Sequence, residues 1–255
     1  MADTFAQPLS LPSSRPALGL AEAACPAEPD AVPDYLRRYY WWAYVHPAAI
    51  KVFERQWLVN LILWGNYARL RDAALDEFGC SLPGTTLQVA CAYGDLSIAL
   101  AERAAAGRGS LDVVDVLPLQ LRNLRAKLPP RLPARLLAMD STRLRLPDAS
   151  YDRVLVFFLL HEQPPDIRRR TLQEALRVVR PGGRIVIVDY ARPRWWHPLR
   201  YLWRPLLAAL EPFALDLWRE DLTDWLPASG IDALSLRTFF GGLYRVLTVA
   251  RRNEA

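Results

Sequence analysis

The sequence predicts an α/β fold, in which a mostly parallel sheet carries helices on both faces. From residue 86 onward, short apolar runs rich in β-branched residues alternate with segments of helical periodicity, as strands and crossover helices do in a parallel sheet. The chain has 255 residues, of which 52% are hydrophobic. Because this composition can fill a layered core, and no internal repeat is present, we expect one large domain with a short appendage.

The elements of this core follow one another in alternation. Apolar runs predict strands at residues 86–92, 110–116, 134–140, 151–160 and 184–190. Helical periodicity predicts helices between them at 94–106, 117–128 and 166–179, the last ended by Pro181-Gly182-Gly183. A helical insertion is then expected at about 197–228, followed by a closing hairpin at 233–240 and 244–252 around Gly241-Gly242. Residues 81–255 are therefore predicted to form the core.

Two segments precede the core. Residues 1–33 contain six prolines and one Arg, which fits neither a signal peptide nor an Arg-rich transit peptide, so we expect a disordered arm. Residues 34–80 are rich in aromatics and predict a helical cap, with one helix at 34–46 and a second at 48–79 after a break near Pro47. No apolar run reaches the roughly 18 to 20 residues that span a bilayer.

Charge and cysteine content narrow the class of protein. The net charge is +5, and Arg outnumbers Lys 30 to 2. The arginines are scattered, so we expect no nucleic-acid partner, whereas a weakly basic surface near an anionic membrane is consistent with them. The three cysteines, Cys25, Cys80 and Cys91, have no CxxC spacing. They indicate neither a disulfide framework nor a zinc site, and we expect a cytoplasmic, reducing location.

Candidate ligand-binding residues follow the first three predicted strands, where doubly wound sheets bind their ligands. The stretch LQVACAYGDLS, residues 87–97, places small residues and the N–H groups of a helix N-terminus at the end of the first strand. An acid at the end of the second strand suits a ribose diol, although Asp115 could instead be a helix cap. An acid at the end of the third strand, or its neighbours, can meet an adenine edge. The predicted cofactor-binding residues are Gln88, Ala90, Ala92, Tyr93, Gly94, Asp115, Val116, Asp140 and Ser141.

Three segments then carry a family resemblance. DVVDV, MDSTRLRLPDASYDRVLVFFLLHEQP and LRVVRPGGRIVIVDY together resemble the class I S-adenosylmethionine (SAM) methyltransferase core, nearest to its ubiquinone and menaquinone branch. The resemblance covers residues 84–190 and implies a Rossmann-like fold with a seven-stranded sheet. Typical members carry a loop like D-V-A-G-G-T-G-D-L. Here Gln88 replaces the acid, Ala92 a glycine and Tyr93 a threonine.

The altered loop has a match of its own. VACxYGDL, preceded by RRYYWWAYVHP and followed by LLHEQP, is similar to the rhodoquinone-biosynthesis family. That resemblance implies conversion of ubiquinone to rhodoquinone, by replacement of a ring methoxy group with an amino group. It also implies SAM as the nitrogen donor and assistance by Mn²⁺. We hypothesise that Gln88 leaves the SAM amine neutral and nucleophilic, and that Tyr93 turns this amine toward the quinone.

The segment that follows the fourth strand offers further candidates. His161 could act as a general base on the amine or as a metal ligand, and Glu162 could bind a hard cation such as Mn²⁺. A metal on a quinone carbonyl would polarise the ring. His161 could instead cap the strand while Glu162 is solvated. Asp189 and Tyr190, at the end of the fifth strand, are weaker candidates.

Aromatic segments invite a quinone-binding or membrane-binding interpretation. Rings stack on planar headgroups, and Trp and Tyr favour membrane interfaces, although aromatic clusters in helices more often pack in a core or a lid. The residues concerned are Tyr35, Tyr39, Tyr40, Trp41, Trp42 and Tyr44, with Trp195, Trp196 and His197 later and Arg37, Arg38, Arg194, Arg200 and Arg204 beside them. We expect a protein peripheral to the inner face of a bacterial cytoplasmic membrane.

Alternatives to amino transfer remain open. The first is an O- or C-methyltransferase that acts on a quinone or a related aromatic. The second is a catalytically silent SAM-fold protein that binds a partner or RNA. A silent protein would be expected to lose Asp115, Asp140 and the histidine after the fourth strand, all of which this chain has. A nicotinamide enzyme is disfavoured because the Gly-x-Gly-x-x-Gly turn is missing.

Overall fold

The computed structural model describes residues 32–40, 47–226 and 230–253. Most of the predicted disordered arm, and the aromatic residues Trp41, Trp42 and Tyr44, lie outside these ranges. Four helices precede the first strand: α1 (Asp34–Tyr39), α2 (Pro47–Phe53), α3 (Gln56–Ile62) and α4 (Tyr67–Asp76). We refer to the described part of residues 34–80 as the cap.

The centre of the molecule is a seven-stranded sheet in the order β3-β2-β1-β4-β5-β7-β6. The first five strands pair in parallel, and β7 and β6 join antiparallel at one edge. This confirms the predicted mostly parallel sheet and the closing hairpin. The strands are β1 (Thr85–Val89), β2 (Ser110–Asp115), β3 (Ala134–Ala138), β4 (Tyr151–Phe157), β5 (Val179–Tyr190), β6 (Ile231–Phe239) and β7 (Tyr244–Arg251).

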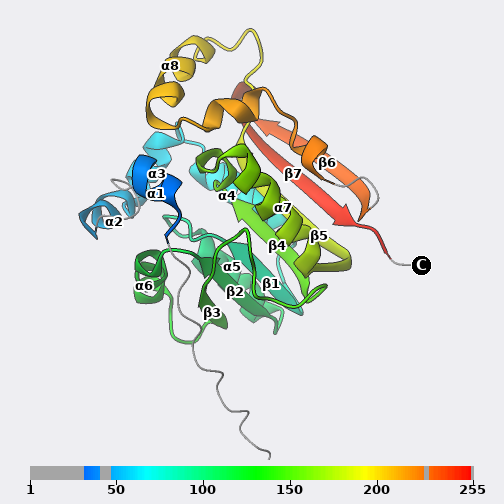
Figure 1. Cartoon of the computed structure of the whole chain (residues 1–255). Coiled ribbons are helices and arrows are strands. Elements are labelled where there is room, and N and C mark those ends of the chain that lie inside the picture. Colours follow the sequence, from blue (N-terminus) through cyan, green and yellow to red (C-terminus); the bar gives the residue numbers. More distant parts are fainter. Residues whose placement is uncertain (1–31, 41–46, 227–229, 254–255) are drawn as a thin grey trace, which may run out of the picture.

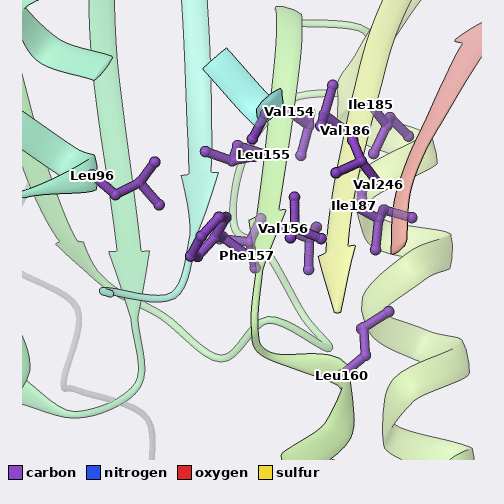
Figure 2. Packing of buried hydrophobic residues seen from close by; sticks show 14 of the residues in the cluster. Leu96, Val154, Leu155, Val156, Phe157, Leu160, Ile185, Val186, Ile187 and Val246 are labelled. Carbon is purple, nitrogen blue, oxygen red and sulfur yellow. The ribbon is translucent and has the colours of Figure 1, made fainter. Parts of the chain in front are cut away.

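Helices connect the parallel strands and flank both faces of the sheet (Figure 1). The crossovers are α5 (Leu96–Ala106), α6 (Pro118–Lys127) and α7 (Pro165–Val178). The central strands are buried on both faces, so their sequences are continuous apolar runs without alternation. Figure 2 shows this packing around Val154–Phe157 of β4 and Ile185–Ile187 of β5.

The structure corrects two of the predicted boundaries. The single helix expected at 48–79 is three helices, because Arg55 is extended (φ −68°, ψ 111°) and Trp64 and Gly65 have positive φ angles of 52° and 77°. The fifth strand begins at Val179 and not at residue 184, so Pro181-Gly182-Gly183 lies inside it. Gly182 has a φ of +73°, and the pairing with β4 changes register between Tyr151 and Arg153.

The insertion between β5 and β6 contains helix α8 (Arg200–Leu210) and the short 3₁₀ turns η3 (Ala214–Trp218) and η4 (Leu222–Trp225). It lies at the same end of the molecule as α3 (Figure 1), and the rings of Trp64 and Trp203 meet edge to face at 5.4 Å. The fully buried Arg168 of α7 connects this region to the segment after β4, because it donates to the carbonyls of Leu160, Gln163 and Phe213. The insertion and the cap therefore meet above the carboxyl ends of the strands.

Candidate functional site

A cavity of about 500 Å³ lies at the carboxyl ends of the parallel strands and is enclosed by the cap and the insertion. Most of the predicted site residues border it: Ala90, Ala92, Tyr93, Asp115, Val116, Asp140, Ser141, His161, Glu162 and Tyr190. Gln88, Gly94 and Asp189 do not line it. Most of the predicted residues thus come together at one cavity, while three of them lie outside its lining.

The loop between β1 and α5 is held by one buried hydroxyl from the cap. The Tyr67 hydroxyl accepts hydrogen bonds from the backbone N–H groups of Asp95 and Leu96, each at 3.0 Å. A Cβ added to Gly94 would come within 2.5 Å of this oxygen, and Gly94 also has a φ of +84°. The expectation that the α5 N-terminus offers free N–H groups is therefore wrong for these two, because a tyrosine already occupies them.

Gln88 lies fully buried beneath the same loop. Its Nε2 donates to the carbonyl of Ala90 at 3.0 Å, and Ala90 has a positive φ of 69°. Its Oε1 is buried and has no hydrogen-bond partner among the described residues. The side chain therefore supports the turn at Ala90 and does not line the cavity. The presence or absence of a charge at residue 88 would act on a ligand at a distance and not through direct contact.

The outer side of the loop is neutralised by ion pairs. Glu54 of the cap, which accepts a hydrogen bond from Gly94 N–H at 3.3 Å, forms an ion pair with Lys127 of α6. Lys127 also donates to the Gly94 carbonyl at 2.7 Å. Asp95 pairs with Arg71. Glu54 and Asp95, the carboxylates on this outer side, thus each have a cationic partner.

Tyr93 is fixed in the cavity wall from two sides. Its hydroxyl accepts a hydrogen bond from Nε2 of Gln120 at 2.8 Å. Its ring stacks on Phe53 of the cap, with ring centroids 5.9 Å apart. A residue that replaces a threonine in the typical loop is thus held in one position at the edge of the ligand space.

Asp115 connects the loop after β1 to the end of β2. Its Oδ2 accepts from the N–H of Cys91, and its Oδ1 from the N–H of Leu117, both at 2.8 Å. Burial raises the pKa of Asp115 to about 6, although both backbone bonds lower it. Each carboxylate oxygen has a second lone pair. The carboxylate can therefore order the loop and also accept from a ribose diol.

Asp140 and Ser141 follow β3 and border the cavity beyond Asp115. The N–H of Thr142 donates to Asp140 Oδ1 at 2.8 Å. The Ser141 hydroxyl lies 2.9 Å from that of Thr171 and accepts from Nε2 of Gln163 at 3.1 Å. These contacts fix the turn that would face an adenine edge.

His161 and Asp189 form a buried pair on the opposite side of the cavity. Nδ1 of His161 lies 3.0 Å from Asp189 Oδ1, which leaves Nε2 as the nitrogen available to a ligand. Burial opposes a charged ring, but the Asp189 carboxylate outweighs it and raises the pKa of His161 to about 9. Burial also acts to raise the pKa of Asp189, yet the charge of His161 holds it below its usual value. The Asp189 carboxylate therefore favours the imidazolium form of the ring.

The donor set around His161 does not fit the Mn²⁺ site that the sequence suggested. Nε2 of His161 lies 3.7 Å from Glu162 Oε1, so these two side chains could offer only two neighbouring ligands. Over the described ranges, no three His, Cys, Asp or Glu side chains are grouped closely enough to hold a metal ion.

Sequence analysis missed Glu211, a carboxylate that the insertion contributes to the cavity. Burial raises the pKa of Glu211, while the charge of His161 and the nearby Tyr40 hydroxyl lower it. A single acid at the end of the Leu-rich segment RPLLAALEPF was the available signal. Tyr67 was missed for a different reason. The residues around it predict a helix, and nothing in that pattern indicates that its hydroxyl contacts the loop before α5.

Comparison with known proteins identifies the family. A family model described as "Methyltransferase domain" matches residues 86–183. Demethylmenaquinone methyltransferase of Beutenbergia cavernae is 33% identical over 211 residues, which cover 77% of this chain and 83% of that protein. The chain belongs to the SAM-dependent methyltransferase family. As a member of it, the protein is a methyltransferase-like enzyme that uses SAM.

Two further comparisons agree with this assignment. The ubiquinone/menaquinone biosynthesis C-methyltransferase UbiE of Syntrophotalea carbinolica is 31% identical over 169 residues, covering 64% of this chain and 65% of that protein. The crystal structure of a SAM-dependent methyltransferase from Methanosarcina mazei has a TM-score of 0.52 at 18% identity, covering 67% and 93% of the two chains. The structural comparison supports the fold. The two relatives bear the names demethylmenaquinone methyltransferase and ubiquinone/menaquinone biosynthesis C-methyltransferase, and both names refer to quinones.

The cavity offers room and polar groups for SAM, the cofactor of this family. Asp115 and Asp140 offer carboxylates on one side of it, and Ala90 and Ala92 leave room beside the loop. His161 stands on the other side of the cavity. The two sides are thus formed by different strands.

We predict that Gly94→Ala destabilises the protein more than Gly79→Ala. Both glycines have positive φ, +84° and +92°, but an added Cβ meets Tyr67 only at position 94 and meets nothing within 4 Å at position 79. Each variant should lose about 1–2 kcal/mol through its backbone conformation. Gly94→Ala should lose about 1–3 kcal/mol more through the clash, measured by urea unfolding. Equal losses in the two variants would contradict the contact with Tyr67.

Proposed function

We propose that this enzyme converts ubiquinone to rhodoquinone, replacing a ring methoxy group with an amino group whose nitrogen comes from SAM. The observation that carries the proposal is the charge around the β1–α5 loop. Gln88 stands where typical members carry the loop acid, and Glu54 and Asp95 on the outer side of the loop are paired with cations. Asp115 on the inner side accepts from the N–H of Cys91, and burial raises its pKa, which favours its neutral form. The similarity to the rhodoquinone-biosynthesis family supports the same function.

An uncharged amine is required for this chemistry. A carboxylate close to an amine favours the ammonium form, which has no lone pair with which to attack a quinone ring. In a buried site the interaction extends beyond direct contact. A neutral side chain at position 88, and compensated charges at Glu54 and Asp95, therefore favour a nucleophilic amine at the methionine end of SAM.

Tyr93 contributes position. Its ring is held by Gln120 and Phe53 at the edge of the cavity, on the same loop as Ala92. Its bulk narrows the space beside the methionine end of SAM. We assign it the role of directing the amine, and not the methyl group, toward the quinone.

His161 supplies a proton where negative charge develops. When nitrogen bonds to the ring carbon that carries the methoxy group, an electron pair moves onto a ring carbonyl oxygen. The His161 imidazolium can donate its Nε2 proton to that oxygen. As the carbonyl re-forms and the carbon–oxygen bond to the methoxy group breaks, His161 recovers its proton from the oxygen, and the new ring nitrogen gives up a proton so that methanol leaves. To release the amino group, the bond between this nitrogen and the α-carbon of the donor would then have to break: the quinone ring would take two electrons from it, water would hydrolyse the resulting imine to an α-keto acid, and the amino-substituted ring would be left at the hydroquinone level until a quinone of the membrane pool reoxidises it. Asp189 positions the ring and keeps it charged.

A second candidate is methyl transfer to a quinone-derived ring. It is favoured by the names of the relatives, a demethylmenaquinone methyltransferase and a ubiquinone/menaquinone C-methyltransferase. The two reactions are distinguished by their products. Amino transfer exchanges methoxy for amino and lowers the mass of the quinone, whereas methylation raises it.

We predict that amino transfer declines as the pH rises through about 9, where His161 loses its proton. His161→Gln should lower kcat by about 10²–10⁴-fold and remove that high-pH limb. The measurement is kcat against pH with SAM and a short-tailed ubiquinone. His197→Gln is the matched control, since His197 is also buried but lies outside the cavity lining. A limb that persists in His161→Gln would contradict the role of the imidazolium.

We predict that Gln88→Asp slows amino transfer at neutral pH while SAM still binds. The new carboxylate should raise the pKa of the cofactor amine, so activity should return at higher pH. Calorimetry would follow SAM binding, and mass spectrometry would identify the quinone product. Gln88→Asn, which shortens the side chain by the same amount without adding charge, is the control. Unchanged amino transfer at neutral pH in Gln88→Asp would refute the proposed charge effect.

A further inference from the structure

An exposed apolar surface surrounds the mouth of the cavity on α3, α8 and the segment before α8. Ile62, Trp64, Leu206 and Leu210 line the cavity and are also exposed to solvent by 38–48%. Apolar side chains with a larger exposed fraction continue the surface away from the cavity. They are Trp57 at 62%, Leu61 at 64%, Trp195 and Tyr201 at 78%, Trp196 at 54% and Leu202 at 51%. We call these ten residues the rim.

Such a concentration is unusual on a folded protein, where large apolar side chains are exposed singly. Two elements far apart in the sequence contribute to the rim, and they are joined by the contact between Trp64 and Trp203. Figure 1 shows α8 projecting from the end of the molecule at which α3 lies. The exposed residues Ile62, Trp64, Leu206 and Leu210 thus border one cavity from two sides, and the other rim residues belong to the same two helices and to the segment before α8.

Positive charge accompanies the rim. The segment from Ala191 to Leu210 contains four arginines and no Asp or Glu. Lys51 of α2 and Arg55, which immediately precedes α3, are exposed. None of these six cations forms an ion pair with any residue that the structure describes, in contrast to Arg71, Arg135 and Arg177 elsewhere on the surface.

We propose that the rim docks on an anionic lipid bilayer, with α8 lying in the plane of the interface and the cavity opening toward the lipid. Trp and Tyr side chains are favoured at the headgroup level, and arginines can reach phosphates while their stems stay apolar. An 11-residue helix is about 16 Å long, which suits a position in the interface and not across it. No helix in the described ranges is long and apolar enough to cross a membrane.

Charge complementarity selects a bilayer over a protein partner. An anionic membrane attracts clustered cations across the whole surface without requiring individual acidic partners. Aromatic and aliphatic side chains in the same surface can then enter the acyl boundary. Neither attraction depends on a defined shape, which suits a surface formed by a loop and two short helices.

This surface deepens the proposed function. A quinone with a polyprenyl tail resides in the bilayer, and a cavity that opens within the rim lets the ring enter while the tail stays in lipid. The docking itself does not depend on the reaction. Vesicle binding measured without SAM or quinone therefore tests it separately from amino transfer.

The test is flotation of the full chain with vesicles of phosphatidylglycerol and phosphatidylcholine, compared with phosphatidylcholine alone. Wild-type protein should float with the anionic vesicles, and the bound fraction should fall as salt rises. Trp195→Ser with Tyr201→Ser, and separately Arg194→Glu with Arg204→Glu, should each weaken partitioning by at least about tenfold. None of these four residues lines the cavity, so SAM affinity should be unchanged.

Matched controls lie away from the rim. Leu234→Ser with Leu236→Ser removes exposed apolar side chains from β6, and Arg108→Glu with Arg131→Glu reverses exposed charges at the amino ends of β2 and β3. Both controls should bind vesicles nearly as wild type does. The proposal is overturned if wild-type protein does not float, or if rim and control variants bind equally. It is also overturned if sedimentation shows a dimer that the rim variants dissociate and that binds no vesicles.

Discussion

The hydroxyl of Tyr67 is the contact on which the arrangement of the site depends. It belongs to the cap, is buried, and accepts hydrogen bonds from the backbone N–H groups of Asp95 and Leu96 at the start of α5. Its position against Gly94 explains why this glycine is present in a loop that otherwise lacks them. Cap and loop therefore cannot move independently without exposing unsatisfied N–H groups. The cap, in turn, supplies the ring of Phe53 and the carboxylate of Glu54 to the loop.

The two ends of the cavity treat charge differently. On the outer side of the loop, Glu54 and Asp95 are paired with Lys127 and Arg71, and the residue behind the turn is a neutral glutamine. At the opposite side, Asp189 keeps a proton on His161 in a buried environment. A site with a neutral nucleophile at one end and an acid at the other suits attack on an electron-poor ring. The rim places the opening of this site where a lipid-soluble ring would approach.

Sequence reasoning gave the layered sheet because β4 and β5 are long apolar runs separated by regular helices. The sequence also predicted that Asp115, Asp140 and His161 lie near one another, and all three border the cavity, since the ends of parallel strands meet at one edge. It did not find Tyr67 or Glu211, whose roles arise from contacts between segments far apart in the chain. It assigned Gln88 to the cavity, although the turn at Ala90 leaves that side chain behind the loop. The protonation of His161 was likewise hidden, because it follows from the distance to Asp189.

The measurement that most directly tests the proposed chemistry uses SAM labelled with ¹⁵N in its amino group and ¹³C in its methyl group. Purified enzyme and a short-tailed ubiquinone would be incubated with this cofactor, and the quinone product analysed by mass spectrometry. The charges around Gln88 and His161 predict a product that contains ¹⁵N, lacks one methoxy group and carries no ¹³C. A product that carries the ¹³C methyl group and no ¹⁵N would contradict amino transfer and identify the enzyme as a methyltransferase of the quinone ring.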